Sequence, residues 1–139
     1  MEVDHKRALE LITAAAEKDC PDALAEMANM YQNGNGVPRD VPTAIRWTYR
    51  LIDYQKRNIA SEKDAIDSIT IHRNLGVQYG SARKYTEERT AYLNTLSEIE
   101  RLKDMISPNE ILRQRMYTYE QLIGVCIKLW EPCEAYLEQ

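Results

Sequence analysis

Apolar residues recur along most of the chain at intervals of three and four residues, which is the spacing of one face of an α-helix. The stretch over residues 21–33 shows this pattern, with Ala23, Met27, Met30 and Tyr31 on one face. A strand would instead alternate apolar and polar residues between turn signals, and no such stretch occurs in the sequence. The pattern therefore predicts an all-α protein.

Two stretches of the first half resemble each other. DHKRALELI begins at Asp4 and DVPTAIRWT begins at Asp40, 36 residues later. Because an aspartate side chain accepts the free backbone N–H groups of a first helical turn, both residues are predicted to cap helices. A period of this length is typical of helical repeats. The apolar residues that follow lie in one register: Ala8 with Ala44, Leu9 with Ile45, and Leu11 with Trp47.

The loop YQNGNGVPRD, residues 31–40, allows two interpretations. A Gly-x-Gly pair can cradle a phosphate, but such a loop follows a strand and carries a Lys-Ser/Thr pair, which is missing here. A turn between two helices instead uses the freedom of Gly34 and Gly36 to take positive φ. We therefore expect a turn after a helix that begins near Pro21, with Val37 pointing inward and Asp40 capping the next helix.

The second half carries longer helical patterns and several start signals. SEKD, residues 61–64, resembles a capping box, Thr86 is a candidate cap, and SPNE, residues 107–110, has Ser, Pro and Glu in the order of a helix start. A last, short helix is predicted from Pro132. The apolar faces of the three long helices are Ile66, Ile69, Leu75, Tyr79 and Ala82; Tyr92, Leu96, Ile99 and Leu102; and Leu112, Met116, Tyr119, Ile123, Cys126 and Trp130.

The segment AAEKDCPDALAEMANMYQNGNGVPRDVPTAIRWTYRLI, residues 15–52, resembles a Sel-one-like repeat, a relative of the tetratricopeptide repeat. It departs from the family pattern at Asp19, where Gly is usual, and at Leu51 and Ile52, where small residues are usual. The resemblance implies a right-handed α/α solenoid of antiparallel helix pairs. The matching residues are Ala15, Ala16, Glu17, Ala23, Met27, Ala28, Tyr31, Gly34, Gly36, Val37, Asp40, Ala44 and Trp47.

Residues 1–57 then form the Sel-one-like unit, with 4–17 as the second helix of a partial repeat and 21–57 as the full repeat. Because the chain opens on a second helix, we expect it to be a piece of a longer array. Residues 58–139 resemble degenerate tetratricopeptide repeats through LGVQY, residues 75–79, where a small residue lets the partner helix approach closely. The alternative is a non-repeat helical cap on the same solenoid domain.

Composition and charge narrow the class of protein. The net charge of −4 argues against a nucleic-acid partner, which favours a basic face. The three cysteines, Cys20, Cys126 and Cys133, are too few and too widely spaced for a disulfide framework, and we expect them to be buried free thiols. No apolar run reaches the length of a membrane span and no signal peptide opens the chain, which predicts a cytoplasmic protein without membrane insertion.

Catalytic and metal-binding motifs are missing from the sequence. His5 and His72 lie on different elements and without His-x-x-x-His spacing, so we expect His5 to be solvated and His72 to be a partly exposed helix residue. Acidic residues such as Glu98 lie near Arg101 and Lys103 and indicate a solvated helix face with local ion pairs. We expect no enzyme activity, no cofactor and no metal.

The resemblance implies a protein–protein interaction module, a scaffold or adaptor that binds a peptide or protein segment on its concave face. The alternative is a structural segment that self-associates through exposed solenoid ends, such as Leu9, Leu11 and Ile12. An enzyme, the third class, would need His72 beside two carboxylates in a pocket. The concave-face positions are Asp22, Ala25, Asn29, Gln32 and Asn33 in the first unit, and Thr70, Arg73, Val77 and Ser81 in the second.

Overall fold

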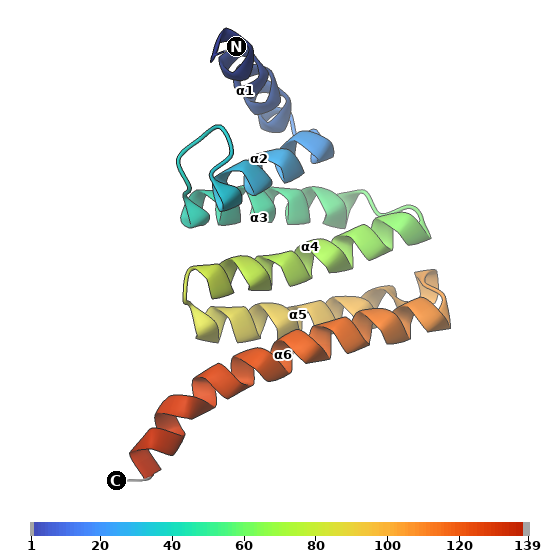
Figure 1. Cartoon of the computed structure of the whole chain (residues 1–139). Coiled ribbons are helices and arrows are strands. Elements are labelled where there is room, and N and C mark those ends of the chain that lie inside the picture. The colour runs from blue at the N-terminus through green and yellow to red at the C-terminus, as the bar shows by residue number, and fades with distance from the viewer. Residues whose placement is uncertain (1, 138–139) are drawn as a thin grey trace. The chain divides into compact units, whose positions relative to one another are not determined.

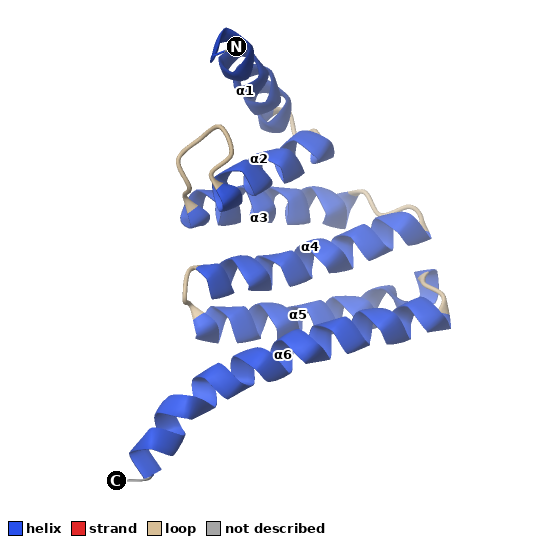
Figure 2. Ribbon diagram, in the orientation of Figure 1, coloured by secondary structure: helices blue, strands red, loops and turns tan. Residues whose placement is uncertain are grey.

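The chain is all-helical, as the spacing of its apolar residues predicts. A computed structural model describes the backbone of residues 2–137 and the side chains of residues 4–130, and no strand occurs in that part of the chain (Figures 1 and 2). The helices are α1 (Glu2–Glu17), α2 (Pro21–Asn33), α3 (Val41–Arg57), α4 (Glu62–Ser81), α5 (Tyr85–Leu102), the short 3-10 helix η1 (Lys103–Met105) and α6 (Pro108–Leu137).

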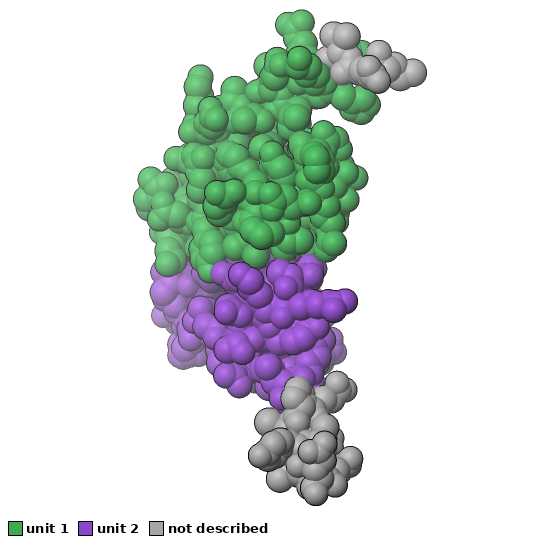
Figure 3. All heavy atoms as spheres, turned by 90° about the vertical axis from the view of Figure 1, so that its left-hand side faces the viewer, with its two compact units in different colours: residues 1–58 green, residues 59–139 purple. Residues whose placement is uncertain are grey.

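The helices form two compact units, residues 1–58 and residues 59–139 (Figure 3). The first unit contains α1, α2 and α3, and the second contains α4, α5, η1 and α6. Each unit has its own set of buried residues, and each is described by itself below.

The loop between α2 and α3 is a turn, which confirms the structural interpretation of its glycines. α2 ends at Gly34, whose φ of 72° lies in the left-handed region, and Gly36 has a φ of 77°. Asp40 then caps α3: its carboxylate accepts hydrogen bonds from the Thr43 backbone N–H at 3.3 Å and from the Thr43 hydroxyl at 2.7 Å. Both helix termini that meet in this loop are therefore satisfied by residues of the loop itself.

The first unit packs around small and flexible apolar side chains. Leu24 and Met27 of α2 are almost fully buried, as are Ala16 of α1 and Ala44 of α3. The Thr13 hydroxyl of α1 lies 3.8 Å from the Met27 sulfur, which places α1 against α2. Small residues at these positions let helix axes approach closely, and the methionine fills the space that remains.

The second unit begins at a helix cap that the sequence predicts. The Ser61 side chain accepts a hydrogen bond from the Asp64 backbone N–H at 3.2 Å, and the Asp64 carboxylate accepts one from the Ala60 backbone N–H at 3.0 Å. Beyond this cap, α4 and α5, together with the residue that follows η1, enclose a buried apolar cluster of Ala65, Ile69, Ile99, Leu102 and Ile106.

α4 and α5 approach closely at two glycines. A Cβ placed on Gly76 would overlap the ring of Tyr92, which is fully buried, and one placed on Gly80 would lie 2.6 Å from a carboxylate oxygen of Glu88. Tyr92 and Glu88 are one helical turn apart on α5, as Gly76 and Gly80 are on α4. The predicted role of the glycine in LGVQY, close approach of a partner helix, is therefore confirmed for Gly76.

Three predicted helix boundaries are wrong. α1 begins at Glu2, so Asp4 lies within the helix and does not cap it. α5 begins at Tyr85 after Lys84, so Thr86 lies inside its first turn. α6 continues through Pro132 to Leu137, so no separate last helix begins there. A helix-starting residue type is common near real starts, but the backbone around it decides which residue takes the extended cap conformation.

Replacing Gly76 by alanine should destabilise the second unit. The added methyl group meets the buried Tyr92 ring, and such overpacking costs about 1–3 kcal/mol. The matched control is Gly124→Ala in α6, where an added Cβ has no neighbour within 4 Å and helix propensity favours alanine. Urea unfolding followed by circular dichroism should show a lower midpoint for Gly76→Ala and an unchanged or higher one for Gly124→Ala. Equal midpoints would contradict the close approach.

Candidate functional site

The predicted site residues of the first unit lie along α2. Asp22, Ala25, Asn29 and Asn33 are exposed and follow one another at three- and four-residue intervals, so they share one face of the helix. Asn33 donates a hydrogen bond from Nδ2 to Asn29 Oδ1 at 3.2 Å. Gln32 is half-buried, and its backbone carbonyl accepts a hydrogen bond from Arg39 Nε at 3.1 Å. The four exposed residues form a small polar stripe.

The predicted residues of the second unit lie on α4, and one of them contacts α6. Val77 and Ser81 are exposed, whereas Thr70 and Arg73 are half-buried. The Arg73 guanidinium donates a hydrogen bond to Gln114 Oε1 at 2.7 Å and lies over the ring of Tyr117, 5.5 Å from its centre. Arg73 is therefore held by the second unit's own helices, and burial, the largest effect, lowers its pKa.

The most unusual surface of the described chain is the apolar face of α6. Leu112 is 60% exposed, Ile123 is 59% exposed and Trp130 is 59% exposed. A single exposed leucine needs no explanation, but a contiguous apolar stripe marks a contact surface. We call these residues the α6 stripe: Leu112, Met116, Tyr119, Ile123, Cys126 and Trp130, all of them exposed.

The opposite face of α6 holds the helix on the unit. Gln114, Thr118 and Val125 are buried, and the Thr118 hydroxyl donates a hydrogen bond to the Gln114 carbonyl at 2.7 Å. Two ion pairs reach α5: Arg115 with Glu100 at 3.0 Å, and Lys128 with Glu88 at 3.7 Å. Apolar contacts add to these polar ones, since Ile111 packs against the apolar cluster of the unit. The residues of the α6 stripe remain outside.

A shallow hollow lies on the exposed side of α6. Its lining consists of Asn109, Leu112, Arg113, Met116, Tyr117 and Glu120. The apolar floor therefore has a basic residue near one end and an acidic residue near the other. Arg113 and Glu120 lie on the same flank of the stripe, seven residues apart. Such a surface suits the apolar face of another helix.

The interior of the second unit contains a polar cluster that the sequence does not predict. His72 is only 9% exposed, so the expectation of a partly exposed residue is wrong. Its Nδ1 lies 2.7 Å from the Ser68 backbone carbonyl. The Glu98 carboxylate accepts hydrogen bonds from the Ser68 hydroxyl at 3.2 Å and from the Arg101 guanidinium. Glu98 is buried, so it does not belong to a solvated face.

The surroundings of Glu98 favour its charged form. Burial alone would raise its pKa, but the hydrogen bond from Arg101, the charges of His72 and Arg101, and the hydrogen bond from Ser68 together hold the pKa below its ordinary value of 4.5. Glu98 and Ser68 lie on facing helices, α5 and α4. The cluster therefore joins the two helices. Its carboxylate is that of Glu98, whereas an acid–base pair would use two carboxylates.

A second polar contact lies beside it on the same two helices. The Tyr92 hydroxyl donates a hydrogen bond to Glu88 Oε2 at 3.1 Å, and burial, together with the Glu88 charge, raises the pKa of Tyr92 far above its ordinary value. Among the described residues, no group of three or more His, Cys, Asp or Glu side chains could hold a metal ion. Tyr92 and Glu88 therefore bond to each other in the interior.

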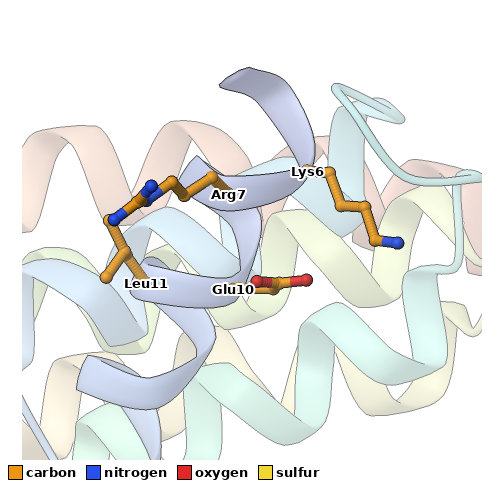
Figure 4. Close-up of a pocket in the computed structure, with 4 residues that line it drawn as sticks. All are labelled: Lys6, Arg7, Glu10 and Leu11. Carbon is orange, nitrogen blue, oxygen red and sulfur yellow. The ribbon is translucent and has the colours of Figure 1, made fainter. Parts of the chain in front are cut away.

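The first unit has two surface depressions. One is lined by Lys6, Arg7, Glu10 and Leu11, which all come from successive turns of α1, so it is the surface of one helix and not an enclosed site (Figure 4). The other runs between α1 and α2 and includes His5, Leu9 and Ile12. His5 is exposed as expected, and Leu11, predicted to form an open apolar end, is 64% exposed.

Two of the three cysteines have described side chains. Cys20 and Cys126 are exposed free thiols, so the expectation that they are buried is wrong, and the side chain of Cys133 lies outside the described residues. Within residues 2–137, none of the helices combines the length and the apolar character that crossing a bilayer demands.

Comparison with protein-family models, with curated proteins and with solved structures gives no match to this chain.

The sequence predicts the apolar face of α6 but not that this face is exposed. The apolar spacing from Leu112 to Trp130 is visible in the sequence, and an amphipathic helix normally buries such a face. One feature of the sequence does favour exposure of the stripe. Gln114 and Thr118 lie on a second face of α6, and this second face packs against the unit. The buried Glu98 has no such signal, because its Arg101 partner looks the same on a solvated helix.

The Glu98 cluster should make stability depend on pH. Because the folded pKa is depressed, the unfolded state binds more protons in the window just below 4.5, and the contribution of Glu98 is lost as pH falls through its folded pKa. Glu98→Gln should therefore lower the unfolding free energy at pH 7 by about 1–3 kcal/mol, and the difference from wild type should shrink near pH 3.

Urea midpoints of dilute protein at several pH values check this. The control is Glu120→Gln, which neutralises an exposed carboxylate on α6 and should change the midpoint little at any pH. A Glu98→Gln deficit that persists unchanged at pH 3 would show that the carboxylate charge contributes nothing.

Proposed function

We propose that this chain is a non-catalytic protein-interaction module and that it binds an amphipathic helix on the α6 stripe. The observation that carries the proposal is the exposure of six side chains, mostly large and apolar, along one face of one helix. Partners that use such a surface place apolar anchors at three- and four-residue intervals into the facing groove. The hollow around Leu112 and Met116 provides one place for such an anchor.

The internal bonding of the polar groups supports a binding role and not a catalytic one. His72, Glu98 and Arg73 are the groups that chemistry would use, and each contacts a side chain or carbonyl of its own unit. General acid–base catalysis requires such groups to face a substrate. Because these side chains are held between helices, they contribute to the stability of the unit instead.

The proposed architecture is a right-handed solenoid of antiparallel helix pairs, related to the Sel-one-like and tetratricopeptide repeats. Contacts between α4 and α5 support the pairing, because Ser68 meets Glu98 and Gly76 meets Tyr92. Residue numbers rise along α4 in the direction in which they fall along α5, as in an antiparallel pair. The Gly-rich turn before α3 supports the repeat. In such an array, α6 takes the position of a first helix, and its stripe lies on a face that a paired helix would contact.

The polar faces of α2 and α4 are a second candidate surface within the same function. Asn29 and Asn33 are exposed and bonded only to each other by side chains, which leaves polar atoms for an incoming peptide. A partner there would be held by hydrogen bonds and its binding would weaken with salt. The α6 stripe is favoured because burial of large apolar groups contributes more to affinity than exposed polar contacts do.

Selection of helical peptides against the purified chain tests the proposal. Peptides chosen from a displayed library of amphipathic helices should lose at least about ten-fold in affinity when Met116 or Ile123 is changed to glutamate, because a charge then enters the buried contact. Both side chains are exposed, so the fold should survive, as circular dichroism can check.

The matched controls are Asn29→Ala and Val77→Ala, exposed positions on the predicted concave faces. They should leave the selected peptides bound if α6 is the contact surface. Peptides that ignore the α6 substitutions but respond to these two would move the binding surface to α2 and α4. A selection that yields no binder would count against a helix-binding function altogether.

A further inference from the structure

The spacing of the α6 stripe is that of a coiled-coil seam. Its residues follow one another at intervals of four, three, four, three and four, the alternation of the two apolar positions in a heptad. This is the repeat that keeps one apolar seam facing a second helix over several turns. From Leu112 to Trp130 the seam is about 27 Å long at 1.5 Å per residue.

Only one flank of the seam is open. On one side lie Arg115, which pairs with Glu100 of α5, and Leu122, which is half-buried. On the other side lie Arg113, Glu120 and Ile127, which are exposed. A second helix must therefore cover the seam from the side of Arg113 and Glu120.

We infer that the helix bound by the α6 stripe is α6 of a second copy of this chain, packed antiparallel in a two-fold symmetric dimer. This inference rests on the proposed function and names its partner. In antiparallel coiled coils, the same flank of each helix meets its counterpart. The open flank of one copy then faces the open flank of the other.

The charges fit this arrangement. When Met116 lies opposite Tyr119 of the partner subunit, Leu112 lies opposite Ile123 of the partner subunit. The same register brings Arg113 beside Glu120 of the partner subunit, and the two-fold axis repeats that contact. Within one helix Arg113 and Glu120 are seven residues, about 10.5 Å, apart, too far for three- or four-residue pairing. Arg113 pairs with Glu110 of its own helix at 2.6 Å, and its exposed guanidinium has further N–H donors for Glu120 of the partner subunit.

The ends of the seam fit as well. The register carries Trp130 toward the start of α6 of the second copy, where Met105 is exposed. The two tyrosine and two tryptophan rings of a dimer each bury a large area on contact, and the thioethers of Met105 and Met116 pack well against aromatic rings. An isologous contact of this kind closes on itself and does not grow into a fibre.

Analytical ultracentrifugation of the whole chain, from about 1 to 200 µM at low salt, tests the inference. The wild type should pass from one copy to two as concentration rises. Met116→Glu and Ile123→Glu should remain monomeric, because each dimer would bury their charges. Asn94→Glu, an exposed position on α5, is the matched control and should dimerise as the wild type does.

Charge exchange tests the antiparallel pairing. R113E and E120R should each weaken self-association about ten-fold or more, because each places like charges together twice. An equimolar mixture of the two variants should recover the wild-type association, since both contacts of the mixed dimer again join opposite charges. The double variant R113E/E120R should recover it too.

A parallel dimer would instead bring Arg115 to Glu120, so rescue of E120R by R115E, and not by R113E, would overturn the antiparallel arrangement.

A chain that stays monomeric at every concentration, or a dimer that Met116→Glu leaves intact, would overturn self-association through α6. If that monomer still bound selected helical peptides through Met116 and Ile123, the proposed function would survive and its partner would be another protein's helix. Loss of both self-association and peptide binding would overturn both the dimer and the proposed function.

Discussion

The close approach of α4 and α5 at Gly76 is the contact on which the second unit depends. The glycine leaves room for the Tyr92 ring, and the ring carries its hydroxyl to Glu88. Glu88 in turn lies against Gly80 and meets Lys128 of α6. One missing side chain on α4 thus sets the position of a tyrosine, a carboxylate and then the next helix. A larger residue at position 76 would shift every later contact in this series.

The same unit reverses the usual arrangement of an amphipathic helix. α6 turns Gln114 and Thr118 inward and is tied to α5 by the Arg115–Glu100 and Lys128–Glu88 ion pairs. Exposed ion pairs contribute little stability each, so Val125 and the burial of the polar side chains' carbon atoms must contribute too. The consequence is an outward apolar face that α4 and α5 leave exposed.

The buried polar cluster joins α4 to α5 and contributes to the stability of the second unit. His72 Nδ1 lies against the Ser68 carbonyl, and the Glu98 carboxylate accepts hydrogen bonds from Ser68 and pairs with Arg101. Buried polar groups of this kind favour one helix pairing over its alternatives, because any slip leaves a charge without a partner. The exposed surfaces of the chain differ in kind: that of α2 is polar and that of α6 is apolar.

Local sequence determined the elements of this protein. Pro21, Gly34, Asp40 and Ser61 mark helix ends through the backbone geometry each residue type allows, and the apolar spacing marks the helix faces. The turn at Gly34 and Gly36 and the small residue at Gly76 follow from the same local chemistry. Where that chemistry was ambiguous, as at Asp4, Thr86 and Pro132, the neighbouring backbone decided the helix boundary and the sequence-based prediction was wrong. Burial required the tertiary structure. Whether His72 and Glu98 lie inside and the α6 stripe outside depends on which helices are present to cover each face, and a side chain's own identity does not carry that information.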